Sequence, residues 1–166
     1  MPRHKTLSDA DVLAKTRRLH AEGGDKAVSF GTVARASGLA ASTLAQRYGS
    51  VAGMLAAAAR DGWAGLIGAT AAAEAEAADK GPQGFLKALD NAAREAPMLL
   101  ALGARDAAAA EAAAQWRGAV EAALARRLGN GERARQSAQA LFALWQGQVL
   151  WGGSEVKIKD IARRLA

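Results

Sequence analysis

Residues 28–48, VSFGTVARASGLAASTLAQRY, decide the fold of the N-terminal part of this 166-residue chain. Ser29 is placed to accept a hydrogen bond from a backbone N–H one turn later, and it precedes a helix whose apolar residues recur three and four positions apart. Gly38 ends that helix, because glycine enters the left-handed region without a Cβ clash and turns the chain sharply. A second short helix is expected from about Ala41. Two short helices joined by a glycine turn predict a helix-turn-helix.

The second helix of this pair has an apolar side and a polar side. Leu44 and Tyr48 lie four positions apart, so both can pack back onto the first helix. The other side chains face outward, where polar groups can contact DNA. These outward residues are Ala41, Ser42, Thr43, Gln46 and Arg47.

The first third of the chain resembles the N-terminal domain of the TetR family of bacterial transcriptional regulators. The matching features are an amphipathic helix over Asp9 to Ala21, the Glu22-Gly23-Gly24 turn, the Ser29-capped helix with Val33-Ala34, the Ser37-Gly38-Leu39 turn, and Ser42-Thr43-Leu44 leading to Tyr48. The resemblance implies a three-helix DNA-binding domain at residues 1–50. It also implies a helical domain at residues 51–166 for ligand binding and dimerisation.

Two positions depart from the family pattern. Members of the family usually carry a tyrosine where this chain has Ala45, and a lysine at the start of the fourth helix, where this chain has Val51. Both usual residues contact DNA phosphates in the family. The resemblance therefore implies fewer phosphate contacts for this chain.

The composition predicts an all-α fold. Alanine, the best helix former, supplies roughly a quarter of the residues. No stretch alternates apolar and polar residues with β-branched enrichment over the length of a strand, so no sheet is expected. The pattern predicts about nine helices. Those after the helix-turn-helix are expected at residues 50–78, from Pro82, from Pro97, and at residues 106–128, 132–150 and 155–165.

The net charge of +6 is unevenly distributed along the chain. Residues 1–50 hold eight Lys and Arg against four Asp and Glu, whereas residues 51–130 hold eight against nine. A positive N-terminal part is expected if that end approaches a polyanion. The C-terminal run of Lys157, Lys159, Arg163 and Arg164 is either a second contact or the solvated face of a last helix.

The C-terminal part suggests a dimer and an effector site. In the family, the last long helices of two subunits pack as a four-helix bundle, and the helices expected at 106–128 and 132–150 occupy the matching place. Small residues such as Gly147 permit close helix contact, although packing within one chain is the alternative. Large apolar side chains can line a cavity for a small apolar or aromatic effector, or can simply form core. These candidates are Trp63, Phe85, Met98, Trp116, Phe142 and Trp145.

Catalysis and cofactor chemistry have little support in the sequence. The only histidines are His4 and His20, there is no cysteine, and no acidic pair has the spacing of a metal site. No metal, cofactor or enzymatic activity is therefore expected. The sequence has neither a signal-peptide pattern nor an apolar run long enough to span a bilayer, so we expect a cytoplasmic protein without a membrane partner.

The function expected from these features is that of a homodimeric transcriptional regulator, a ligand-responsive repressor that binds a palindromic operator in double-stranded DNA. Ser42, Gln46 and Arg47 are candidates for base-edge or adjacent phosphate contacts, and Thr43 and Ser29 for phosphate contacts. For Ser29, helix capping is a complete alternative explanation. Arg3 and Lys5 are candidates for backbone or minor-groove contacts through an N-terminal arm. The alternative function is a helical ligand-binding or protein-interaction module that does not bind DNA.

Overall fold

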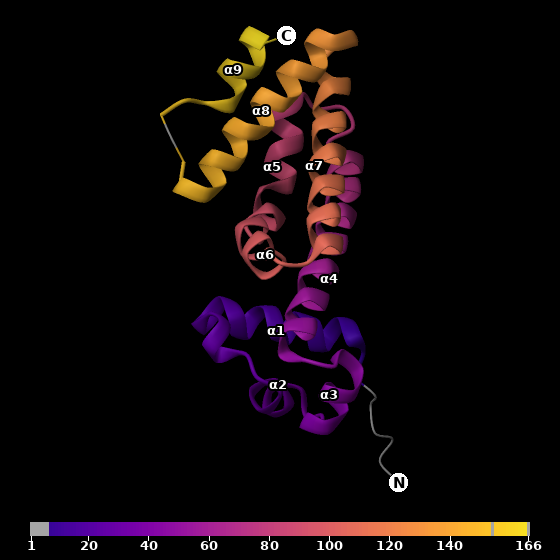
Figure 1. Ribbon diagram of the computed structural model, residues 1–166. Coiled ribbons are helices and arrows are strands. Elements are labelled where there is room, and N and C mark those ends of the chain that lie inside the picture. Colours follow the sequence, from indigo (N-terminus) through magenta and orange to yellow (C-terminus); the bar gives the residue numbers. More distant parts are fainter. Residues whose placement is uncertain (1–6, 154, 166) are drawn as a thin grey trace. The chain divides into compact units, whose positions relative to one another are not determined.

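The structure is a computed structural model that describes residues 7–153 and 155–165. Within these ranges every regular element is a helix and no strand occurs, so the expected all-α fold with about nine helices is confirmed (Figure 1). The α-helices are α1 (Asp9–Gly23), α2 (Phe30–Ser37), α3 (Ala41–Tyr48), α4 (Val51–Glu76), α5 (Pro82–Ala93), α6 (Ala96–Leu102), α7 (Ala107–Leu128), α8 (Gly131–Trp151) and α9 (Ile158–Leu165). A 3₁₀ turn, η1 (Asp25–Ala27), connects α1 to α2.

The starts of three helices are marked by local side chains. The Ser8 hydroxyl accepts a hydrogen bond from the Asp11 N–H at 3.2 Å and caps α1. Pro82 occupies the first turn of α5, where its missing N–H costs nothing. The Asp106 carboxylate accepts from the Ala109 N–H at 2.8 Å and caps α7. Two capping side chains and one first-turn proline therefore mark these boundaries.

The chain forms two compact units. Unit 1 contains the described residues up to Gly62 together with Met98–Ala110, and unit 2 contains Trp63–Pro97 and the described residues from Glu111 onward. Helix α4 contributes residues to both units, as do α6 and α7. The segment Met98–Ala110 thus joins the unit that contains the helix-turn-helix.

Unit 1 is built around a small apolar core. Its fully or almost fully buried members are Val12, Val28, Val33, Leu44 and Met54, supplied by α1, the α1–α2 connection, α2, α3 and α4. Burial of side chains of this size contributes about 1.5–3 kcal/mol each, which offsets the low intrinsic stability of eight-residue helices. The core therefore holds α3 in place.

Polar contacts extend unit 1 beyond this core. Arg17 of α1 forms a 2.7 Å ion pair with Asp61 of α4 and donates to the Ala58 carbonyl at 3.1 Å. Arg60 of α4 forms a 2.8 Å pair with Asp106, the residue that caps α7. These contacts tie α4 to α1 and to the segment 98–110.

Unit 2 buries apolar side chains from α4, α5, α7 and α8. Its fully buried members include Phe85, Leu89, Leu124 and Leu141. Helix α9 packs against α5 and α8, and the Ser137 hydroxyl donates to the Leu165 carbonyl at 3.1 Å. No helix in the described part of the chain is both long and apolar enough to cross a membrane.

Candidate nucleic-acid interface

Helix α2 begins with a complete capping box. The Ser29 hydroxyl accepts from the Thr32 N–H at 3.1 Å, and the Thr32 hydroxyl accepts from the Ser29 N–H at 2.9 Å. Two orphan N–H groups of the helix start are thereby satisfied. The Ser29 hydroxyl is used in the cap, as the capping explanation of this residue expects.

The turn between α2 and α3 depends on Gly38. Its φ of 76° and ψ of 8° lie in the left-handed region, and its N–H donates to the Ala34 carbonyl at 2.8 Å. The Ser37 hydroxyl then accepts from the Leu39 N–H at 3.3 Å. This turn directs the chain into α3.

Helix α3 presents the polar side that its sequence predicts. Leu44 is completely buried and Tyr48 is half-buried, so these two residues anchor the helix to unit 1. Thr43 is half-buried at the edge of the anchored side. The exposed residues on the helix are Ala41, Ser42, Gln46 and Arg47. We call these four residues the α3 outer face. The other two predicted DNA contacts, Arg3 and Lys5, lie outside the described residues.

Asp9 is a residue of this region that the sequence reasoning did not assign a role. Its carboxylate accepts from Arg47 Nη1 at 2.9 Å and from the Tyr48 hydroxyl at 3.2 Å, which joins the start of α1 to the end of α3. Burial raises the pKa of Tyr48, and the negative charge and hydrogen bond of Asp9 raise it further. Because 38 residues separate Asp9 from Arg47, helical periodicity cannot predict this contact.

Ala45 and Val51 are the two positions at which this chain differs from the pattern of the family that it resembles, and both side chains are apolar. Ala45 is half-buried on α3, and Val51 is half-buried at the start of α4, where it packs against the core of unit 1. Beside it, the Ser50 hydroxyl accepts from the Gly53 N–H at 2.9 Å. Neither position offers a side-chain group that can hydrogen-bond to a phosphate.

The large apolar residues proposed for an effector pack mainly against one another. In unit 2, the Trp116 ring lies 5.4 Å from Trp63, 5.8 Å from Phe142 and 6.4 Å from Trp145, between ring centroids. Trp116 Nε1 also donates to the buried Thr70 hydroxyl at 3.1 Å. Phe85 is fully buried beneath the Arg127 guanidinium, whereas Met98 is half-buried and belongs to unit 1.

An open groove lies beside this aromatic cluster in unit 2. It has a volume of about 330 Å³ and is lined by Trp145, Asp90, Arg94 and the start of the α8–α9 connection. Trp145 Nε1 donates to the Asp90 carboxylate at 3.1 Å at the same place. Of the six proposed effector residues, Trp145 alone lines this groove. The groove combines an indole face with one carboxylate and one guanidinium.

The outer sides of α7 and α8 carry small and apolar residues. On α7, Ala114, Gly118 and Ala122 are exposed at four-residue spacing. On α8, Ala140 and Ala143 are exposed and Gly147 is half-buried, and the helix ends with Leu150 and Trp151, which are 56% and 83% exposed. We call these residues the α7–α8 outer stripe.

Comparisons by sequence find nothing: no protein-family model matches the chain, and neither does any curated protein. Solved structures do match. A TetR family transcriptional regulator, PfmR from Thermus thermophilus, superposes with a TM-score of 0.61 at 18% identity, over 92% of this chain and 93% of that chain. A protein with unknown function from Rhodococcus sp. RHA1 gives 0.68 at 18% identity, over 99% and 94%. The likeness is one of fold: this chain has the all-helical fold of a TetR family transcriptional regulator.

Proposed function

We propose that this protein is a DNA-binding transcriptional regulator, a ligand-responsive repressor that binds a palindromic operator as a homodimer. The observation that carries the proposal is the α3 outer face, an exposed polar side on a helix that is anchored through a buried leucine. In a helix-turn-helix the second helix enters the major groove and its side chains contact base edges. The fold of the regulator from Thermus thermophilus supports the same function.

Each residue of the interface has a role in this proposal. Ser42 and Gln46 contact base edges or adjacent phosphates from the exposed side of α3, and Arg47 does so from its last turn. Ala41 lies at the start of the helix, where only a close backbone approach or an apolar contact is available. Thr43 and Ser29 lie at the edge of the interface as phosphate contacts. Arg3 and Lys5 complete the interface through the N-terminal arm.

The α7–α8 outer stripe is the proposed dimer seam. Small residues allow helices of two subunits to approach closely, and exposed Leu150 and Trp151 supply apolar area to bury. A homodimer places two α3 helices on two half-sites about 34–36 Å apart, which explains a palindromic operator. We propose residues 1–50 as the DNA-binding domain, residues 51–166 as the regulatory and dimerisation domain, and the cytoplasm as the compartment.

The proposed effector is a small apolar or aromatic compound. The aromatic cluster and Phe85 are packed, so entry of a compound would begin at the open groove beside Trp145. Effector binding would then shift the equilibrium toward a state that does not fit two successive major grooves. We propose that this function requires neither a metal ion nor a cofactor.

Selection from a random pool of double-stranded DNA tests the function. The protein should enrich duplexes that contain a palindrome. A triple variant, Ser42→Ala with Gln46→Ala and Arg47→Ala, keeps the buried Leu44 and should stay folded by circular dichroism while it loses the enrichment. A folded, dimeric wild type that enriches no sequence would contradict DNA recognition. That outcome would favour the ligand-binding or protein-interaction module, in line with the apolar side chains at positions 45 and 51.

A further inference from the structure

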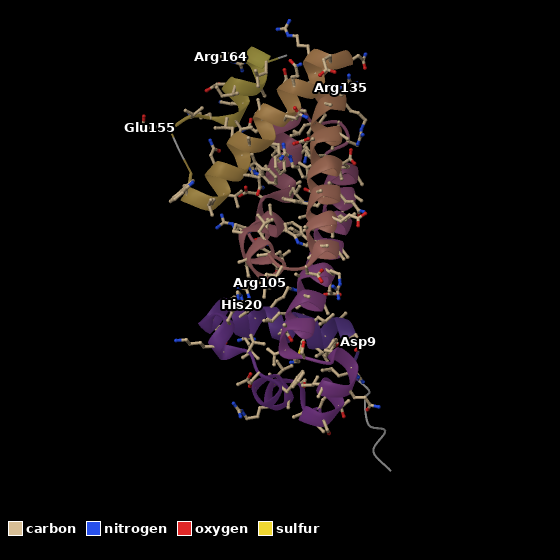
Figure 2. All side chains as sticks on the ribbon, viewed as in Figure 1. Asp9, His20, Arg105, Arg135, Glu155 and Arg164 are labelled. Carbon is tan, nitrogen blue, oxygen red and sulfur yellow. The ribbon has the colours of Figure 1, made fainter. Side chains whose placement is uncertain are left out.

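The start of α1 supplies a negative charge to the proposed DNA interface. Asp9, labelled in Figure 2, is the first residue of α1. Its side chain is 69% exposed and its carboxylate accepts from Arg47 Nη1 at 2.9 Å, while the Arg47 side chain is 30% exposed. The Tyr48 hydroxyl donates to the same oxygen, so two residues of α3 fix the position of this carboxylate. A carboxylate oxygen bound to a guanidinium uses the same donor that a DNA phosphate oxygen would use.

We infer that Asp9 is a positioning residue that restrains sequence-independent DNA binding by holding Arg47 in the free protein. The inference rests on the proposed function. A phosphate that contacts Arg47 through Nη1 displaces the Asp9 carboxylate, so one anion replaces another. A correct operator adds base-edge contacts from the rest of the α3 outer face, whereas random DNA offers only the exchange of anions.

The exposure of the pair makes this exchange feasible. Ion pairs that are open to water are weak and are screened by salt, so DNA can open the Asp9–Arg47 pair. The exchange also alters counterion release. DNA gives up a counterion when Arg47 binds a phosphate, but Asp9 is left without its partner and attracts a cation. The salt dependence of binding should therefore be shallower by about one contact, with a slope of roughly 0.9 per phosphate.

Binding of the full-length protein to a random-sequence duplex at salt concentrations from about 50 to about 200 mM tests the inference by fluorescence anisotropy. Asp9→Asn should tighten binding about 2- to 5-fold at the low-salt end. It should also steepen the slope of log K against log salt by about 0.9 for each bound protomer. Glu22→Gln is the matched control, because it removes one carboxylate of α1 whose partner is Arg18 rather than a residue of α3. This control should leave the slope close to that of the wild type.

A second comparison identifies Arg47 as the intermediary. In an Arg47→Gln background, Asp9→Asn should leave the slope unchanged, because the restrained donor is gone. If Asp9→Asn disturbs the start of α1 in circular dichroism, Asp9→Ser removes the charge with a residue that also suits a helix start.

The outcomes separate this inference from the proposed function. Wild type that binds the duplex with the same slope as Asp9→Asn would overturn the inference alone. An effect of Asp9→Asn that persists in the Arg47→Gln background would overturn it as well. Absence of duplex binding by every variant would overturn both the inference and the proposed function.

Discussion

Two buried threonines use their hydroxyls in different ways. Thr16 donates to the Val12 carbonyl of its own helix at 3.0 Å, and this is the only hydrogen bond of its hydroxyl among the described residues. Thr70 donates to the Leu66 carbonyl at 2.9 Å and also accepts from Trp116 Nε1 at 3.1 Å. The Thr70 hydroxyl therefore gives the buried indole N–H of Trp116 its hydrogen-bond partner, and removing that hydroxyl leaves the N–H unpaired.

Thr70→Val should lower the free energy of unfolding by about 1–3 kcal/mol, because it leaves a buried donor unpaired. Thr16→Val is the matched control. It should cost less, since the Val12 carbonyl keeps its helical hydrogen bond. Urea unfolding followed by tryptophan fluorescence measures both. Equal losses for the two variants would contradict the assigned role of Thr70.

Residues that follow a helical period were predictable one by one. The exposure of Ser42, Gln46 and Arg47 and the burial of Leu44 follow from spacing along α3 alone. The contact of Arg47 with Asp9 was not predictable, because it joins two helices whose mutual position depends on the core of unit 1. Likewise, residue type alone named the large aromatic residues as candidates for an effector site but not which of them line an open groove.

At the scale of helices, two glycines of the helix-turn-helix have opposite requirements. Gly38 has a φ of 76°, a conformation that L-residues with a side chain rarely adopt. Gly31 lies within α2 and is exposed, and a methyl group there would meet only the Ser29 hydroxyl at an ordinary 3.7 Å. Replacing glycine with alanine should therefore destabilise the protein at position 38 and stabilise it at position 31.

Gly38→Ala should destabilise unit 1 by roughly 1–2 kcal/mol through left-handed strain. Gly31→Ala should stabilise it by about 0.5–1 kcal/mol, because alanine loses less conformational freedom in a helix. Thermal unfolding by circular dichroism gives both shifts. A melting temperature that rises for Gly38→Ala would mean that the turn adopts another conformation in solution.

Helix ends were predictable where a cap is local and less so elsewhere. Ser29 and Asp106 mark helix starts through hydrogen bonds within one turn, and Pro82 marks one by occupying the first turn. The last helix begins at Ile158 rather than at residue 155 as expected from the sequence. This helix packs against α5 and α8, a contact that local sequence does not specify.

At the scale of the whole molecule, the proposed dimer depends on one side of α8. Gly147 lies half-buried in the middle of the α7–α8 outer stripe, with no atom within 4 Å of a Cβ built on it, whereas Ala138 of the same helix is fully buried in unit 2. A large charged side chain at position 147 thus has room within the protomer. Such a side chain should therefore destabilise the contact with a second protomer and not the fold of the protomer itself.

Gly147→Arg should convert the dimer to monomer in sedimentation velocity at micromolar concentration, because an unpaired charge in an apolar helix contact is costly. Gly68→Arg is the matched control, since Gly68 is an exposed glycine of α4 with equally open surroundings. It should sediment as the wild type does. A monomeric wild type would contradict the proposed seam.

Which segments of the chain belong to each unit was the feature hardest to predict from the sequence. Residues 98–110 follow Pro97 as an ordinary helix and loop, and their pattern resembles that of their neighbours. Their place in unit 1 depends on long-range contacts such as Arg60 with Asp106. A side chain at position 62 would collide with Leu99, so the packing of Leu99 requires the glycine at position 62. The periodicity of apolar residues along one helix does not reveal such contacts between distant segments.

The discontinuity of unit 1 has a consequence for synthesis on the ribosome. The helix-turn-helix emerges first, yet Asp106 and Leu99, which complete the packing around Arg60 and Gly62, are translated tens of residues later. Domains generally fold as units while the chain grows at about 5–20 residues per second. The N-terminal unit therefore waits several seconds for its last segment, while unit 2 has already begun to emerge. A nascent chain stalled before residue 98 should be more sensitive to protease than one stalled well past residue 110.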